Sequence, residues 1–424
     1  MTARAPRDRL RHRLRRPAYL SAIGPGLVTG AADDDPSGIA TYAQAGASFG
    51  YALLWPVLLA WPFLTAFQYS CAEIARVTGR GIAANLAANL PRPAVWGVVV
   101  LLLGANIFNI ASDIAAMGEA ARLVTGWNRP ALMIGFALVS LGLQVFVPYH
   151  RYVGLLKWLT LSLFAYVGVV LVAGVPWQAV RAGLWPSLPP GSATTVVAIL
   201  GTTISPYLFF WQSAQEVEEM QLNHRKPLVR RTRGAVRELG RLALDSVSGF
   251  MVTMLVSACI IAATAATLYG AGGHPITTAA DAAAALRPIA GDFAFALFAC
   301  GIIGTGLLAV PVLAGSAAYA LSEVMGWRAG LELKPREAAG FYGVIALAVA
   351  VALAIDLIGI DAMQALFWTA VINGLVAVPV MVAIMALASR RAVMGRFRVT
   401  GPQAVLGWGA TLLMAGAALA MMIL

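Results

Sequence analysis

Asp33-Asp34-Asp35-Pro36-Ser37-Gly38 interrupts an apolar segment, residues 20–45, that is otherwise long enough to cross a membrane as one helix. A carboxylate at the centre of a spanning helix costs roughly 3 kcal/mol or more, so such residues are retained where they serve a function. The proline removes a backbone donor and breaks the helical ladder, which frees carbonyl oxygens at the same place. The stretch therefore predicts a broken spanning helix with a polar site at the break.

A second interruption of the same kind follows at Thr202-Thr203-Ile204-Ser205-Pro206-Tyr207, inside the apolar segment 195–220. Broken helices at corresponding positions of two halves mark the substrate site in many transporters. We expect Pro36 and Pro206 each to open a half-helix, and the two breaks to form one binding site. The aspartates at the first break favour a small cation as its ligand.

The composition places the chain among multi-span membrane proteins. It is 60% hydrophobic and 12% charged, whereas a soluble protein carries about a quarter charged residues. The mean hydropathy is +0.78. The pattern predicts an all-α fold with eleven spans, near residues 20–45, 51–75, 94–118, 131–148, 152–174, 195–220, 243–268, 290–320, 338–357, 362–388 and 402–423.

The net charge of +11 is distributed in a way that argues for a membrane and against nucleic acid. Of the 30 Lys and Arg residues, 26 lie in the N-terminal tail and in alternate loops, and the exceptions are Arg122, Arg129, Arg181 and Arg287. This bias predicts a cytoplasmic N-terminus and, with eleven spans, an extracytoplasmic C-terminus. The expected partners are the lipid bilayer and a transported ion. No nucleic acid, cofactor or required protein partner is inferred.

The chain divides into a basic tail, residues 1–19, a ten-span core, residues 20–388, and an eleventh helix, residues 402–423. The core predicts two five-span repeats, about 20–174 and 195–388. Because five is odd, the repeats enter the membrane in opposite senses and form an inverted repeat.

The breaks offer only oxygen donors, since the four histidines (His12, His150, His224 and His274) fall outside them. Oxygen ligands suit Mg²⁺, Ca²⁺ or Mn²⁺, and a Na⁺ site remains an alternative. We choose Asp35 for direct contact because it adjoins Pro36. Asp33 and Asp34 either attract the ion along its path or have no role.

Further polar residues occur in other spans. Asn106, Asn109 and Asp113 share one stripe of span 3, which either lines the pathway or joins helices. Gln212 and Glu216 continue span 6 toward the cytoplasm as an acidic vestibule or, with Glu219, as a solvated helix end that meets Arg225 and Arg230. Asn373 in span 10 faces the site or packs helices. Asp356 and Asp361 flank a short outer loop and are expected to be solvated.

Several motifs together resemble the Nramp family of divalent metal transporters. They are Gly24-Pro25-Gly26, Asp35-Pro36, Gly46-Ala47-Ser48-Phe49-Gly50-Tyr51, Asp113-Ile114-Ala115 and Thr203-Ile204-Ser205-Pro206-Tyr207. The resemblance covers the ten-span core. It implies a LeuT-like fold, alternating access, a location in the bacterial inner membrane and no enzymatic activity. It also implies a metal site at Asp35, Gly38, Thr202, Ser205 and Tyr207.

Two departures from the family pattern bear on the ion. Gly38 stands where the family has an asparagine ligand, and Ser205 stands where it has the methionine whose soft sulfur favours transition metals. The pattern is similar to that of the prokaryotic Nramp-related magnesium transporters. It implies a wider pocket for a partly hydrated ion, with Mg²⁺ favoured and Mn²⁺ as the second choice.

The relay groups for protons also depart from the family pattern. Ala116 replaces an acidic residue, Gln212 replaces a histidine, and the span 9 basic pair is at best Arg336-Glu337. We therefore expect uptake without obligatory proton symport. An interior-negative potential offers about 2.3 kcal/mol per charge per 100 mV, and twice that for a divalent ion.

Three alternatives remain open from the sequence. A proton- or sodium-coupled transporter of transition metals would keep the fold and the site. A coupled transporter of a small organic solute would bind an anionic group at a half-helix, which Asp35 would repel. An intramembrane enzyme that acts on Mg²⁺-diphosphate substrates would need two aspartate-rich motifs, and the chain has one.

Overall fold

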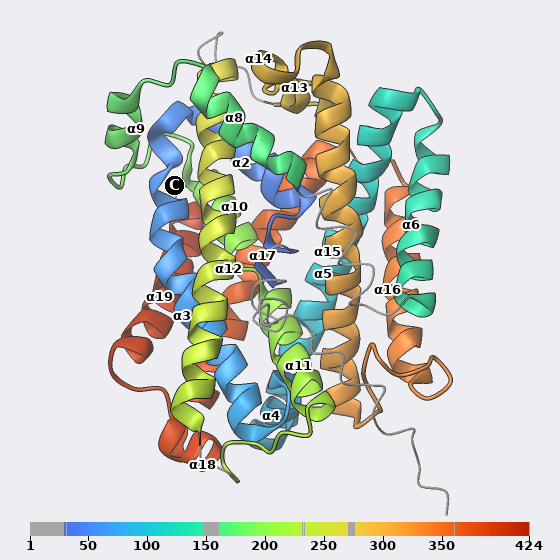
Figure 1. Cartoon of the computed structure of the whole chain (residues 1–424), viewed down its shortest axis with the longest axis vertical. Helices are drawn as coiled ribbons and strands as arrows, with labels where there is room; N and C mark the ends of the chain where they lie inside the picture. Colours follow the sequence, from blue (N-terminus) through green and yellow to red (C-terminus); the bar gives the residue numbers. More distant parts are fainter. Residues whose placement is uncertain are drawn as a thin grey trace, which may run out of the picture.

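The computed structural model describes residues 29–30, 32–147, 161–230, 232, 234–269, 276–359 and 361–423. The basic tail, Gly24-Pro25-Gly26, His12, His150 and His274 lie outside the described residues. The described chain is a bundle of helices (Figure 1): α2 Pro36–Phe49, α3 Trp55–Thr78, α4 Ile82–Asn89, α5 Arg92–Thr125, α6 Arg129–Phe146, α8 Phe164–Val172, α9 Trp177–Gly183, α10 Ala193–Thr203, α11 Pro206–Leu222, α12 Ala235–Thr264, α13 Ala279–Ala284, α14 Arg287–Ala290, α15 Ala294–Met325, α16 Ala339–Asp356, α17 Ala362–Ala388, α18 Arg391–Met394 and α19 Gly401–Ile423.

Length and composition agree with a multi-span protein. Among the described residues, eight helices are long and apolar enough to cross a bilayer, or up to ten if each of two sharply bent helix pairs counts as one span. In each of the eleven predicted spans, most of the residues that the structure describes are helical. Span 5 is described only from Leu161, and its helical part is the 3₁₀ turn Leu161–Leu163 followed by α8.

Both predicted breaks are present. Residues 32–33 are helical, Asp34 and Asp35 leave the helix, and Pro36 begins α2. The predicted sixth span is likewise two helices, because Ile204 has φ −106° and ψ 61° and Pro206 begins α11. Proline alone does not cause such breaks, since α3, α15 and α17 each continue through an internal proline.

The two broken segments lie inside the bundle. α2 packs against α10, α12 and α17, and α10 packs against α17. Two glycines make these contacts close. A Cβ at Gly46 of α2 would overlap Thr264 and the Ile261 carbonyl, and one at Gly201 of α10 would overlap backbone of α17. The close packing holds α2 and α10 at the centre of the bundle (Figure 1).

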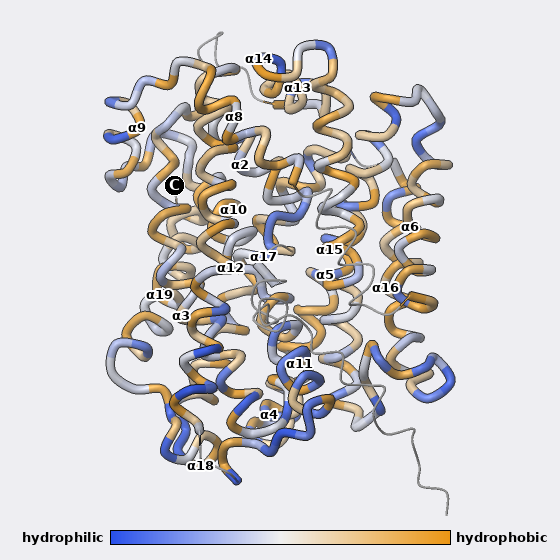
Figure 2. Tube along the Cα trace, in the orientation of Figure 1, coloured by the Kyte–Doolittle hydropathy of each residue, from blue (hydrophilic) through white to orange (hydrophobic). Residues whose placement is uncertain are grey.

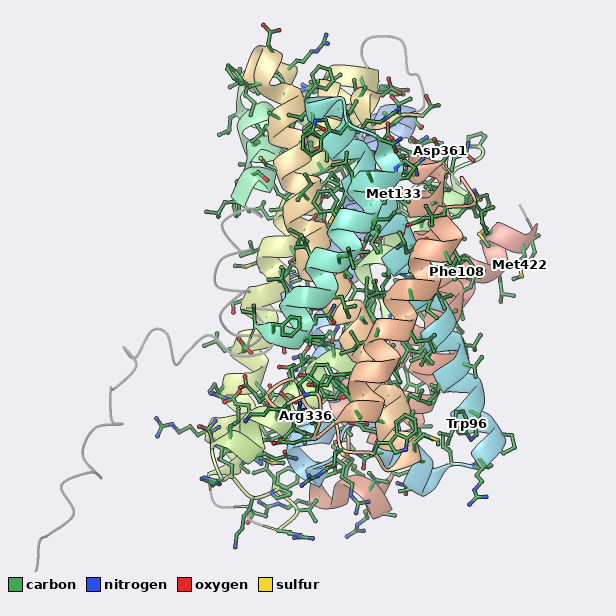
Figure 3. The ribbon with its side chains drawn as sticks, turned by 90° about the vertical axis from the view of Figure 1, so that its right-hand side faces the viewer. Trp96, Phe108, Met133, Arg336, Asp361 and Met422 are labelled. Carbon is green, nitrogen blue, oxygen red and sulfur yellow. The ribbon has the colours of Figure 1, made fainter. Side chains whose placement is uncertain are left out.

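Hydrophilic residues follow the pattern expected for a membrane. Figure 2 shows an apolar middle zone with a hydrophilic stretch at the entry to α2, and hydrophilic segments gathered at the end that holds α4 and α18. In Figure 3, Arg336 lies near that end and Asp361 near the opposite one, while Trp96 and Phe108 lie on the outer side of α5. Exposed apolar side chains such as these two fit a surface that faces lipid.

Candidate functional site

Asp35 caps the half-helix that follows the first break. Its backbone is extended, with ψ 170°, and its Oδ1 accepts hydrogen bonds from the Gly38 N–H at 2.8 Å and from the Ser37 hydroxyl at 2.6 Å. The carboxylate therefore lies at the positive end of the α2 dipole, which helps to hold the charge in a buried position. Its second oxygen, Oδ2, has one long contact, the Tyr207 hydroxyl at 3.5 Å.

The second break faces the first. The Ser37 and Thr202 hydroxyls are 3.4 Å apart, and the Tyr207 hydroxyl donates to the Ala32 carbonyl at 3.0 Å. The Tyr42 and Thr203 hydroxyls are 2.9 Å apart, and Thr203 itself donates to the Ile199 carbonyl. These contacts join the two interrupted spans across the site.

The structure brings together the five residues that the resemblance named as metal ligands. Gly38 contributes space, because a Cβ there would lie 3.2 Å from the Thr202 hydroxyl. The Ser205 hydroxyl donates to the Gly201 and Thr202 carbonyls at the end of α10 and keeps oxygen lone pairs free. Asp35, Thr202, Ser205 and Tyr207 are each at most 1% exposed. Their role as ligands remains a prediction.

Other carboxylates surround Asp35. Asp34 accepts a hydrogen bond from Ser257 of α12 at 3.3 Å. Neither oxygen of Asp33 or of Asp113 has a hydrogen-bond partner in the described part of the chain. Asp113 is close enough to interact electrostatically with Asp35, and Asp33 with both Asp34 and Asp35. The site is therefore a buried concentration of negative charge that favours a cation.

The polar stripe of α5 is buried along its length. Asn106 donates to the Leu313 carbonyl at 3.0 Å, so this residue joins α5 to α15. Asn109 and Asp113, one and two turns further along, have side chains without partners among the described residues, as does Asn373 on α17. Helix packing accounts for Asn106, and the unpartnered groups are candidates for lining the pathway.

Below the second break, α11 carries two buried polar residues. Gln212 donates to the Ser246 hydroxyl of α12 at 3.3 Å, and one oxygen of Glu216 has no hydrogen-bond partner within the described ranges. Glu219 is only partly buried and pairs with Arg241 at 2.8 Å and with Arg225 at 3.8 Å. A solvated helix end thus describes Glu219 but not Glu216, which is 3% exposed.

One expectation for the outer side is wrong. Asp361 is exposed and caps α17 by accepting from the Gln364 N–H at 2.9 Å, as a solvated residue can. Asp356, however, is 5% exposed and interacts electrostatically with Arg129 and Asp113. It lies at the last turn of α16, which packs against α5 and α6, and this packing removes it from solvent.

Sequence reasoning missed several hydroxyl residues of the site. Thr253 donates to the Gly30 carbonyl at 2.7 Å, Ser257 binds Asp34, and Ser316 donates to the Tyr207 carbonyl at 2.9 Å. Hydroxyls in spans commonly bond to their own helix, so their presence in α12 and α15 gave no specific signal. Ser37 was among the oxygen donors expected at the first break, whereas Tyr42, one and a half turns further along α2, was not named.

An outer cavity and a smaller cavity lie near α2. The outer one, of about 230 Å³, lies between α2, α10 and α17, and its lining includes Gln44, Ser48, Thr195 and Gln364. The smaller one, of about 10 Å³, is lined by Ala40, Ala116 and Glu119 among others.

Comparisons with known proteins give a family, relatives in sequence and solved structures of similar fold. The family model "Natural resistance-associated macrophage protein-like" (Nramp) matches residues 26–424. The divalent metal cation transporter MntH of Acidiphilium cryptum is 30% identical over 432 residues, covering 98% of this chain and 93% of that protein. MntH of Burkholderia ambifaria is 27% identical over 412 residues, covering 94% and 88%.

Two solved structures show the fold. The manganese transporter of Eremococcus coleocola matches with a TM-score of 0.76 at 18% identity, over 95% of this chain and 86% of that one. Mhp1, a nucleobase-cation-symport-1 family transporter, matches with a TM-score of 0.59 at 16% identity, over 93% and 92%. They confirm the predicted all-α, LeuT-like fold with its inverted repeat, while the exact repeat boundaries remain predictions.

Proposed function

The chain belongs to the Nramp family, and from this membership we propose that it carries divalent metal cations across a membrane, each ion bound between the two helix breaks. The observation that carries the proposal is the buried Asp35 carboxylate, one oxygen of which is saturated by α2 while the other is nearly free. Family membership also excludes the enzyme alternative, because Nramp proteins are transporters.

The ligands come from the two broken spans. Asp35 Oδ2 supplies charge, and Thr202 and Ser205 supply neutral hydroxyl oxygen beside the C-terminal end of α10, whose dipole favours a cation. Because α2 and α11 each begin at a break, a movement of either helix would open the site toward one side of the membrane. This is how alternating access would expose a fixed site.

The outer cavity supports entry of a hydrated ion from the side of α13 and α14. Six waters occupy about 180 Å³ of liquid volume, which fits the outer cavity of about 230 Å³. Gln44, Ser48 and Gln364 can form hydrogen bonds with such waters. The neighbouring cavity of about 10 Å³, which shares Ala40 and Met363 with the outer one, is too small for such an ion, and Asp35 lines neither cavity. Entry to the site would therefore need a movement of the surrounding helices.

The ion is proposed to be a hard divalent cation, Mn²⁺ or Mg²⁺. The Eremococcus structure is of a manganese transporter, which favours Mn²⁺. The oxygen-only donor set, with Ser205 in place of a sulfur ligand, fits both ions and is the sole argument for Mg²⁺. The comparisons give no support to Mg²⁺ over Mn²⁺, so Mg²⁺ preference is a matter for measurement.

Uptake without obligatory proton symport is likewise a proposal. It rests on Ala116, Gln212 and the absence of a second basic residue beside Arg336, and no comparison supports it. A pH-sensitive dye inside proteoliposomes tests it. Acidification in proportion to metal influx, beyond that of empty vesicles, would contradict it.

We also propose an orientation of the chain in the membrane. The basic end with α4 and α18 would face the cytoplasm, in the bacterial inner membrane, with the C-terminus on the other side.

The central experiment is ion influx into proteoliposomes that contain metal-sensitive dye, with Mn²⁺ and Mg²⁺ offered separately. We expect influx in the wild type and none in Asp35→Ala. Asp292→Asn, which changes an exposed acidic residue at the turn before α15, is the matched control and should transport normally. Absence of influx for both ions in correctly folded wild type would refute the proposed function.

A further inference from the structure

We propose that an anionic diacyl phospholipid binds a groove on the flank of the bundle, with one acyl chain between α3, α12 and α19 and its phosphate at Arg237 and Arg398. The groove is separate from the ion site, because none of its lining residues belongs to either helix break. Three observations support the lipid as its occupant: the shape of the groove, its depth in the membrane and the charges at one end of it.

The groove is a cavity of about 400 Å³ bounded by three helices. α3 packs against both α12 and α19, and all three contribute to the walls. Val247, on the α12 wall, is 39% exposed, so the cavity is open along one side. Most of the lining side chains are apolar or aromatic, which suits a hydrocarbon chain; they include Trp61, Ala66 and Tyr69 of α3, Ala243 and Val247 of α12, and Leu406 of α19.

The groove lies at the depth of the hydrocarbon. α19 begins at Gly401 and has 23 residues, none of them charged. At 1.5 Å per residue it is about 34 Å long, which matches a hydrocarbon core of about 30 Å. Gln403 and Leu406 lie in its first two turns, so the cavity lies just inside the membrane boundary. The same face of α12 continues through Gly240, which has open space beside it, to Val236, which is 89% exposed.

Two exposed arginines lie at the level of the lipid headgroups. Arg398 is three residues before α19, and Arg237 is six residues before Ala243, about 9 Å along α12. The interfacial region of a bilayer is roughly 5–8 Å thick on each side of the core. Both arginines lie at the end of the bundle where hydrophilic segments gather (Figure 2). Within the described ranges, neither forms an ion pair with a carboxylate.

The acidic residues beside these arginines already have partners. Glu238 pairs with Arg76 of α3, and Glu73 is 5% exposed and accepts a hydrogen bond from Gln403 at 2.8 Å. The charge left at the boundary is therefore positive, as in the basic pockets between helices that bind anionic headgroups. Because lipid chains are as apolar as the groove, the groove alone gives little preference among lipids. The arginines supply that preference.

The test is native mass spectrometry of the full-length protein in detergent, with equal amounts of phosphatidylglycerol and phosphatidylethanolamine that carry identical chains. We expect one lipid retained per chain, with the anionic lipid preferred. An arginine near the surface contributes about 1 kcal/mol to binding of anionic lipid, or about fivefold. Arg237→Gln with Arg398→Gln should therefore lower the preference about 30-fold. Arg328→Gln, which changes an exposed arginine after α15, should leave it unchanged.

Two variants test the groove without changing any charge. Ala66→Phe fills it from α3 and Ala243→Phe fills it from α12, and each should abolish retention of both lipids. Leu347→Phe, at a position of α16 that is 64% exposed, adds the same side chain elsewhere and should keep the lipid. Because the two filled variants alter different helices, either one that folds is sufficient for the test.

Three outcomes would overturn the proposal. They are a wild type that retains no lipid, equal retention of the two lipids, and retention that is unchanged when the groove is filled. A dimer without lipid, whose assembly Ala66→Phe abolishes, would also overturn it and would assign the groove to a second copy of the chain. Ion influx is measured separately, so each of these results leaves the proposed transport function as it stands.

Discussion

The two helix breaks have the same backbone form and opposite chemistry. At each, a proline begins the second half-helix and the preceding residue has an extended backbone. The first break carries three carboxylates, whereas the second carries hydroxyls that bond mainly to carbonyls of α10. The comparison indicates that the first repeat supplies the charged ligand of the site and that the second supplies neutral oxygen ligands.

The largest expected effect tests this division directly. Asp35→Asn should lower metal influx more than about 100-fold, beyond the usual cost of a residue that only supports a ligand. Thr202→Ala, the matched change at the second break, should lower it about tenfold or less, because it removes a neutral ligand. Initial rates in proteoliposomes measure both. Equal losses would show that the breaks contribute alike.

Selectivity sharpens the comparison at the second break. Ser205→Met introduces a soft sulfur donor, so the ratio of Cd²⁺ to Mg²⁺ uptake should rise about tenfold or more. The measurement is competition between the two ions in one vesicle preparation, with Ser205→Ala as the control that removes the hydroxyl without adding sulfur. An unchanged ratio of Cd²⁺ to Mg²⁺ uptake in Ser205→Met would mean that the oxygen donor of Ser205 does not set the ion preference.

The hydrogen bonds that join the breaks should have smaller effects. Tyr207→Phe removes the bond to the Ala32 carbonyl and should lower the free energy of unfolding by about 1 kcal/mol. Tyr42→Phe, which removes the contact with Thr203, is the comparable change on α2. Thermal unfolding in detergent compares the two. A loss of unfolding free energy well above that of one hydrogen bond would mean that the bond between the two breaks belongs to a larger network.

The smallest effect is expected outside both breaks, at the turn before α13. Thr278 and Asp281 form a capping box. Burial raises the pKa of Asp281, but the hydrogen bonds that its carboxylate accepts from Thr278 and Thr277 lower the pKa by a larger amount. The net shift of the pKa is therefore downward. The capping stability is therefore present above the ordinary pKa of an aspartate and is lost as pH falls through the lowered value.

Asp281→Asn should accordingly lower thermal stability slightly near neutral pH and make no difference below the lowered pKa. Influx at neutral pH should not change, because the turn is away from both breaks. A transport defect in this variant would mean that the α13 region takes part in the conformational change.

Much of the fold followed from patterns that are local in the chain. Apolar segments of membrane length gave the spans, and Asp35-Pro36 and Ser205-Pro206 gave the breaks, because proline and its preceding residue restrict the backbone wherever they occur. The residues of the predicted metal site adjoin the same breaks, and the family resemblance named them; their role as ligands stays a prediction. Sequence gave no signal for Ser257 or Thr253, which lie on a helix far along the chain.

The sequence by itself determined the helical membrane class, the two breaks and the supply of buried carboxylates, since each depends on residue type and spacing alone. Only the tertiary structure decided how these groups are used. Packing of α12 against the first break placed Ser257 at Asp34, and packing of α16 buried Asp356; Asp33 is left with no hydrogen-bond partner in the part of the chain that the structure describes. Burial and pairing depend on which distant helices meet, and no local pattern in the chain encodes that choice.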